Sequence, residues 1–253
     1  MWIGIVSLFP EIFQALTHYG ITRRAIEKGI IEVETWNPRD FALDRHKTVD
    51  DKPYGGGPGM LMKVEPLNDA IQAAIHKSVT TCPVVYLSPQ GRRMTQADFN
   101  RLAELPELIL VAGRYEGVDE RLIESVIDEE ISIGDFVVSG GELPAMVLID
   151  GITRLLPDAV GDRESVEQES FIDGLLDYPQ YTKPEVVAGQ AVPEVLLSGD
   201  HERIARWRKQ QALGRTLERR PDVLAQRELS DEEQNLLDEY RSHQPNREGK
   251  INE

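Results

Sequence analysis

The chain has 253 residues, 40% hydrophobic and 28% charged, a composition typical of a folded globular protein rather than of a disordered chain. Its formal net charge of −16 excludes a protein that coats nucleic acid indiscriminately, because that affinity comes from neutralising phosphates, so any contact with nucleic acid must be local. No apolar run approaches the roughly 20 residues of a membrane span, and the single cysteine, Cys82, permits no internal disulfide, which together predict a cytoplasmic protein without membrane association.

The first 157 residues alternate β-branched segments with helical patterns, an alternation typical of a mostly parallel α/β sheet. The expected strands are 2–8, 31–36, 83–88, 108–112 and 131–138. The expected helices are 64–76, 95–103, 119–126 and 142–156, with Thr95 and Asp119 as candidate N-cap residues. Residues 1–157 are therefore predicted to form one α/β domain.

The pattern changes after Pro157. Residues 158–170 are polar and acidic without periodicity, which predicts an exposed, flexible linker between domains. Residues 171–245 are predicted to form a small helical domain, with helices at 203–217 and 231–241 and a capping box made by Ser230 and Glu233. Residues 246–253 have no apolar anchor and are expected to be a disordered tail.

The densest glycine-rich loop, residues 54–60, is not a phosphate-binding Walker A loop. Met60 and Leu61 stand where that motif needs a lysine followed by serine or threonine. A loop that needs glycine for unusual backbone angles is the simpler interpretation. The first strand is also not followed by a Gly-x-Gly-x-x-Gly pattern, which disfavours a standard dinucleotide-binding fold.

More informative is that three successive predicted strands end in comparable loops, at 86–91, 112–117 and 133–141. If the strands are parallel, these loops gather at one edge of the sheet, where open α/β sheets bind ligands. The sequence therefore predicts a ligand site there. No metal site is predicted, because the five histidines are scattered and a second cysteine is absent.

Several segments match one family in order, namely 7–10, 36–40, 46–51, 54–62, 86–91, 113–121, 133–145 and 174–184. Together they closely resemble the bacterial tRNA (guanine-N1)-methyltransferases of the knotted, SPOUT-type methyltransferase superfamily. The resemblance implies a homodimer, a deep trefoil knot in the N-terminal α/β domain, and a helical C-terminal domain that helps to hold tRNA. Periodicity alone could not indicate the knot, since chain threading is a rare exception.

The implied activity is S-adenosylmethionine-dependent methylation of N1 of the guanine immediately 3′ of the anticodon in tRNA, in an active site shared between two subunits. The resemblance leaves open whether Mg²⁺ takes part. Carried across residue by residue, the cofactor-binding positions are Tyr86, Leu87, Ser88, Pro89, Gly113, Glu116, Ile133, Gly134, Asp135, Phe136, Val137, Val138, Gly140 and Gly141. Glu116 is a candidate to face the sulfonium, although an acid approaching a helix explains it equally well.

Methylation of guanine N1 requires removal of its proton and stabilisation of the negative charge that spreads onto O6. The resemblance implies that Arg154 stabilises O6 and that an acid preceding a Ser-Phe pair is the general base. In this chain Glu169 precedes Ser170 and Phe171, where the family has aspartate. Glutamate has a comparable intrinsic pKa of about 4.3, but its extra methylene shifts the carboxylate, so Asp177 remains an alternative base.

The predicted tRNA contacts are Gly59, Asp177, Arg203, Arg206, Arg208 and Lys209. The last four belong to the most basic stretch of the chain, residues 203–220, where Glu218 is the only acid. A basic stripe is usually a solvated helix face. Here Trp207 lies among the cations and the resemblance assigns this domain to tRNA, which favours phosphate contact.

Two other functions stay open from the sequence. One is a knotted methyltransferase that acts on a ribose 2′-hydroxyl or on ribosomal RNA. The other is a non-catalytic RNA-binding factor, which would show no saturable heat when titrated with S-adenosylmethionine.

Overall fold

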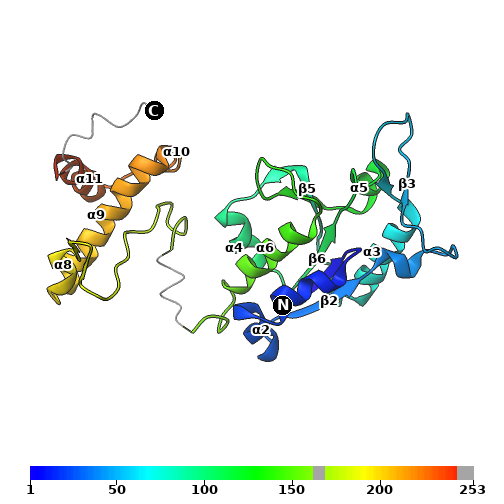
Figure 1. Cartoon of the computed structure of the whole chain (residues 1–253), viewed down its shortest axis with the longest axis horizontal. Helices are drawn as coiled ribbons and strands as arrows, with labels where there is room; N and C mark the ends of the chain where they lie inside the picture. The colour runs from blue at the N-terminus through cyan, green and yellow to red at the C-terminus, as the bar shows by residue number, and fades with distance from the viewer. Residues whose placement is uncertain (162–168, 244–253) are drawn as a thin grey trace. The chain divides into compact units, whose positions relative to one another are not determined.

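The computed structural model describes residues 1–161 and 169–243 (Figure 1). The described residues up to 161 belong to one compact unit and those from 169 to another. The predicted tail at 246–253 and residues 162–168 of the predicted linker lie outside the described residues.

A five-stranded sheet forms the centre of the first unit, in the order β2-β1-β6-β5-β7, and all its neighbouring strands are parallel. Its strands are β1 (Trp2–Val6), β2 (Glu32–Trp36), β5 (Val84–Arg93), β6 (Glu107–Ala112) and β7 (Glu129–Ser132). The prediction of a mostly parallel α/β sheet is confirmed. Val6 pairs with Val111 and Leu87 pairs with Ala112, so β1 and β6 end at one edge of the sheet. Strand β5 passes this edge and continues to Arg93.

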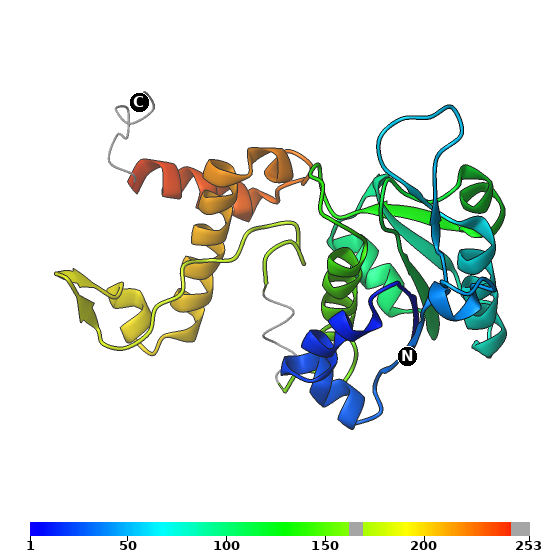
Figure 2. The same cartoon turned by 45° about the vertical axis from the view of Figure 1, so that its right-hand side comes forward.

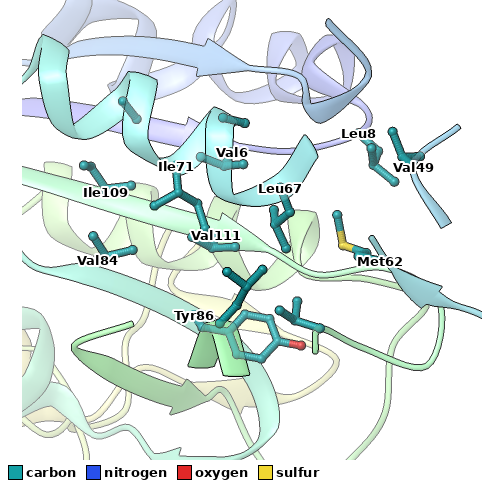
Figure 3. Packing of buried hydrophobic residues seen from close by; sticks show 14 residues of the cluster. Val6, Leu8, Val49, Met62, Leu67, Ile71, Val84, Tyr86, Ile109 and Val111 are labelled. Atoms are coloured by element: carbon teal, nitrogen blue, oxygen red, sulfur yellow. The ribbon is translucent and has the colours of Figure 1, made fainter. Parts of the chain in front are cut away.

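Both faces of this sheet are covered by helices, as Figures 1 and 2 show. Strand β6 is buried throughout, and its alternate side chains enter two separate apolar clusters. Ile109 and Val111 pack with α3 (Val64–Lys77) and α5 (Glu120–Val126), in the cluster drawn in Figure 3. Leu108 and Leu110 pack with α4 (Gln96–Ala103) and α6 (Glu142–Thr153).

Short elements that the sequence pattern did not predict complete this unit: η1 (Pro10–Phe13), α1 (Gln14–Thr17), α2 (Gly20–Glu27), η2 (Pro38–Phe41), β3 (Asp50–Asp51) and β4 (Leu61–Met62). Strands β3 and β4 pair antiparallel, so the glycine-rich loop joins the two arms of a hairpin. Gly55, Gly56, Gly57 and Gly59 in this loop all have positive φ. The interpretation that this loop needs glycine for its backbone angles is therefore confirmed.

Three sequence predictions in this unit are wrong in part. The strand expected at 83–88 continues to Arg93, with a register shift between Leu87 and Arg92, so the loop expected at 86–91 lies within β5. The strand expected at 131–138 ends at Ser132, because Gly134 turns the chain at a φ of 152° and the side chains of Phe136 and Val137 face solvent. The linker expected to be exposed from residue 158 begins packed, because Ala159 is only 2% exposed in a cluster with Ala25 and Ile31. The Lys28 ammonium also donates to the carbonyl of Asp158 at 2.9 Å.

The second unit is mainly helical, with α8 (Glu194–Leu197), α9 (His201–Arg219), α10 (Pro221–Leu224) and α11 (Asp231–His243). A two-stranded hairpin of β8 (Val186–Val187) and β9 (Gln190–Ala191), which the sequence pattern did not indicate, precedes them. The apolar core of the second unit contains Leu175, Ala212, Leu213, Leu224, Leu236 and Leu237. Within residues 1–161 and 169–243, none of the helices is both long and apolar enough to span a bilayer.

Candidate active site

A cleft of about 290 Å³ opens at the carboxyl edge of the sheet, between the irregular second half of β5 and the loops that follow β6 and β7. The predicted cofactor residues that line it are Tyr86, Leu87, Ser88, Pro89, Gly113, Glu116, Ile133, Gly134, Phe136, Val137, Val138, Gly140 and Gly141. Asp135 is the predicted residue outside this lining, and its carboxylate accepts a bond from the Arg93 guanidinium at 3.1 Å. The structure thus brings together loops that are far apart in the sequence.

Tyr86 closes one side of this cleft. Its side chain is 6% exposed and belongs to the apolar cluster of Figure 3, where its ring lies beside those side chains. Burial, and the nearby charge of Glu130, raise the pKa of the Tyr86 phenol to about 12. The phenol therefore stays neutral at physiological pH, and the buried ring of Tyr86 forms a wall of the cleft.

The glycines of the cleft are required by contacts within the protein. A Cβ atom on Gly113 would lie 2.8 Å from the Tyr86 ring, and one on Gly141 would lie 2.6 Å from the Cα of Ala112. The Gly141 amide donates to the Gly113 carbonyl at 2.8 Å, which joins the loop after β6 to the start of α6. Gly113 and Gly141 therefore set the distance between two walls of the cleft.

A buried polar network, to which the sequence analysis assigned no role, lies behind these walls. Glu142 is 0% exposed, and its carboxylate accepts from the Ser7 hydroxyl at 2.8 Å and from Arg114 Nε at 2.8 Å. Arg114 also donates to the Ser139 carbonyl at 3.0 Å and stacks on the ring of Phe9, 4.7 Å from its centroid. The network joins the end of β1, the loop after β6 and the first turn of α6.

The glycine-rich hairpin packs against the loop that carries Glu116. The Glu116 amide donates to the Met60 carbonyl at 2.9 Å, and the Met62 amide donates to the Gly117 carbonyl at 3.0 Å. A Cβ atom on Gly59 would overlap the Glu116 side chain. Gly59, predicted to contact tRNA, and Glu116, predicted to contact the cofactor, are therefore neighbours.

The two predicted catalytic residues do not line this cleft. Arg154 follows the last residue of α6, whereas the cleft lies at the first turn of that helix. At 1.5 Å per residue, the 12 residues of α6 separate the two positions by about 18 Å. Glu169 belongs to the second unit, as does the alternative base Asp177.

Comparison with known proteins identifies the family. The family model described as tRNA (Guanine-1)-methyltransferase TrmD matches residues 1–226. The chain is 60% identical over 240 residues to the tRNA (guanine-N(1)-)-methyltransferase of Aeromonas hydrophila, covering 95% of this chain and 96% of that relative. It is 62% identical over 244 residues to the protein of that name from Pseudomonas paraeruginosa, with 95% and 96% covered.

The chain belongs to the tRNA (guanine-1)-methyltransferase family. The predicted resemblance and the predicted enzyme class, a tRNA (guanine-N1)-methyltransferase, are both confirmed by these matches.

The predicted tRNA contacts on α9 have different surroundings. Arg206 makes two bonds to the Glu239 carboxylate, at 2.9 and 2.7 Å. Lys209 pairs with Asp173 at 3.2 Å and with Glu233 at 3.0 Å. The Arg208 guanidinium stacks on the Tyr178 ring at 4.7 Å, while Arg203 is exposed at the start of the helix. Much of the charge of the predicted stripe is therefore neutralised inside the second unit.

The residues that the structure describes contain no group of three or more histidine, cysteine, aspartate or glutamate side chains placed to hold a metal ion.

Proposed function

We propose that this protein transfers a methyl group from S-adenosylmethionine to N1 of the guanine immediately 3′ of the anticodon in tRNA. The observation that carries the proposal is the cleft at the carboxyl edge of the sheet, in a chain of this family. The cleft is lined by residues of β5 and of the loops after β6 and β7. Its volume of about 290 Å³ is near the lower end of the range of about 300–1,000 Å³ for small-molecule sites.

The residues of the cleft suit S-adenosylmethionine. Backbone groups of the loops at 113–117 and 133–141 can bond the edge of an adenine, while Leu87 and Pro89 offer apolar contact to its flat face. The carboxylate of Glu116 is suited to lie near the positive sulfonium. When bound, the cofactor supplies an electrophilic methyl group and a leaving group that departs neutral.

The protein's own residues are proposed to activate the nucleophile, which is N1 of the target guanine. We assign to Glu169 the removal of the proton from guanine N1, and to Arg154 the stabilisation of negative charge on O6. Asp177 is the weaker candidate for the base, because its two carboxylate oxygens already accept bonds from the Tyr178 amide at 2.8 Å and from the Gln180 amide group at 3.2 Å.

The position of Arg154 supports an active site shared between two subunits of a homodimer. About 18 Å of helix separates Arg154 from the cleft of its own chain, so a second copy must bring its arginine to that cleft. Leu143 and Val147 lie one turn apart on α6 and are 49% and 47% exposed, which supplies an apolar face for self-association. The deep trefoil knot and the cytoplasmic location that the resemblance and composition imply belong to the same proposal.

The second unit is proposed to hold the tRNA through Asp177, Arg203, Arg206, Arg208 and Lys209, with Gly59 contributing from the first unit. The concentration of cations on α9 in a chain of net charge −16 supports this assignment.

The decisive experiment is transfer of a tritiated methyl group from S-adenosylmethionine to tRNA transcripts that carry guanine or adenine 3′ of the anticodon. We expect transfer to the guanine transcript and none to the adenine transcript, with a block to reverse transcription at the modified base. Equal labelling of both transcripts would favour methylation of a ribose hydroxyl or of another position. Reactions with and without Mg²⁺ test whether methyl transfer requires this ion.

Calorimetry distinguishes the proposed enzyme from a non-catalytic RNA-binding factor. A protein that only binds RNA would give no saturable heat with S-adenosylmethionine, whereas the proposed enzyme should bind both this cofactor and its demethylated product.

A further inference from the structure

A second cleft, of about 490 Å³, lies wholly within the second unit. It is lined by Ser170, Leu176, Asp177, Tyr178, Gln180, Arg215 and Arg219. Ser170 directly follows Glu169, the proposed general base. The cleft is therefore built next to the residue that is proposed to meet the target guanine.

Two arginines on one face of α9 give this cleft its charge. Arg215 and Arg219 are four residues apart, so their side chains emerge on the same side of the helix. Neither guanidinium has a hydrogen bond or an ion pair with another residue of 1–161 or 169–243. By contrast, Arg206 on the same helix is paired with Glu239, and the neighbouring Arg220 is paired with Asp222 at 2.7 Å.

The walls of the cleft are fixed by hydrogen bonds that do not use these arginines. The Leu176 amide donates to the Thr216 hydroxyl at 2.8 Å, which holds the segment before Asp177 against α9. The Asp177 amide donates to the Ser170 hydroxyl oxygen at 2.9 Å, so the hydroxyl proton of Ser170 is left to donate elsewhere. These bonds hold the walls of the cleft without the side chains of Arg215 and Arg219.

The balance of charge in the cleft is positive. Asp177 contributes the one carboxylate among its lining residues, and that carboxylate already accepts bonds from the Tyr178 amide and from Gln180. Two guanidinium groups and a hydroxyl donor remain. Planar guanidinium groups match the paired oxygens of a phosphodiester, which they can bind in bidentate fashion.

We propose that Arg215 and Arg219, with the Ser170 hydroxyl, bind a backbone phosphate of the tRNA beside the target guanine. This inference rests on the proposed function and deepens it. A phosphate held at this cleft fixes the strand next to Glu169, whereas phosphates that approach Arg206 also approach the carboxylate of Glu239. The main phosphate contact on α9 is thus one turn or more beyond the contacts predicted at Arg203, Arg206, Arg208 and Lys209.

The test compares the double variant Arg215→Gln with Arg219→Gln against a control, Arg241→Gln, which removes a cation of α11 that pairs with Asp238 at 3.1 Å. Affinity for a tRNA transcript is measured by fluorescence anisotropy over a series of salt concentrations. The double variant should bind tRNA at least tenfold more weakly, and the slope of log affinity against log salt should fall by about 0.7–0.9 for each phosphate that the variant no longer neutralises. Arg241→Gln should change affinity less than threefold, and S-adenosylmethionine binding should be unchanged in both.

Circular dichroism and a further variant with lysine at both positions distinguish weaker phosphate binding from unfolding of the second unit. Lysine restores charge without the planar fork, so it should recover part of the affinity. The inference is overturned if the double glutamine variant binds tRNA normally, or if inorganic phosphate protects this cleft from hydrogen exchange while tRNA does not. Methylation by the wild-type protein is read separately, so its absence would refute the proposed function without deciding the binding result.

Discussion

Among single residues, Glu142 constrains the shape of the cleft at the carboxyl edge of the sheet. Its carboxylate is buried, and each oxygen accepts one bond, from the Ser7 hydroxyl and from Arg114. Removing a carboxylate from water is costly unless its lone pairs are satisfied, so the three side chains hold their positions together. Because Arg114 and Glu142 flank two of the loops that line the cleft, the network fixes the shape in which the cofactor is proposed to bind.

This constraint predicts the effect of Glu142→Gln, which keeps the shape of the side chain and removes its charge. The Arg114 guanidinium would lose its ionic partner, and we expect a loss of about 3 kcal/mol in the free energy of unfolding, with weaker S-adenosylmethionine binding. Chemical denaturation and calorimetry measure the two effects. Glu104→Gln, at an exposed position after α4, is the control and should change neither. Unchanged stability in Glu142→Gln would refute the structural role.

The proposed general base gives a second prediction at this scale. Glu169→Gln keeps hydrogen-bonding capacity but removes basicity, so the single-turnover rate should fall by roughly 10²–10⁴-fold while tRNA still binds. Glu169→Asp restores the residue type of the family and should keep most of the rate. Rates measured across pH provide the check, because a working base gives a rate that rises with pH. A normal rate in Glu169→Gln together with an inactive Asp177→Asn would reassign the base to Asp177.

The location of the cleft could be predicted from the sequence, because parallel strands bring their carboxyl ends together. Its individual residues came from the family resemblance. The Ser7–Glu142 bond could not be predicted, since it joins residues 135 positions apart and neither lies in a distinctive local pattern. The segments that contain Ser7, Arg114 and Glu142 did belong to the resemblance, but the resemblance assigned them no role. Partnerships between distant polar residues appear only when the packing of the loops is known.

Among the secondary-structure elements, helix α11 depends on an acid that links it to α9. Glu233 accepts from the Ser230 amide at 3.0 Å as the acidic member of a capping box, and also pairs with Lys209 and Arg227. Burial acts to raise the pKa of Glu233, but the Ser230 amide, Lys209 and Arg227 outweigh it and hold that pKa at about 2. The charged form of Glu233 therefore stabilises the folded second unit.

The sign of this pKa shift predicts how stability depends on pH. The folded-state pKa of Glu233 is lowered, so its contribution is complete above the unfolded-state pKa of about 4.3 and is lost as the pH falls toward 2. We expect α9 and α11 to lose protection from hydrogen exchange over this range. Glu233→Gln should already exchange faster at pH 7 and should show a smaller change on acidification. An identical pH dependence in both proteins would contradict the assignment.

The elements themselves were predictable where a cap or a long periodic pattern marks them. Asp119 caps α5, and the Thr95–Asp98 and Ser230–Glu233 pairs form capping boxes. Elements of two to four residues, such as β3, β4 and α10, are too short to show a period. The strand predicted at 131–138 failed because β-branched and aromatic residues after Ser132 line the cleft instead of extending the sheet.

For the molecule as a whole, the proposed role of Arg154 predicts an assembly of two copies. Within one chain α6 places the proposed cation about 18 Å from the proposed cofactor site, which no side chain can span. Sedimentation at micromolar concentration should therefore show a dimer. In the proposed shared site each cleft receives its arginine from the partner subunit, so neither subunit should be active alone.

Subunit mixing tests this arrangement directly. Arg154→Ala removes the proposed cation, Val138→Trp fills the cleft, and each variant alone should be inactive. Co-expressed in equal amounts, they should recover about one quarter of wild-type activity, because half of the dimers are mixed and each mixed dimer has one intact site. The control carries both changes in one chain and is mixed with wild type. It should leave about one quarter of the activity if sites are shared, and about one half if each subunit is self-sufficient. Failure of the two single variants to complement each other, with one half of the activity in the control, would show that each cleft uses its own chain's Arg154.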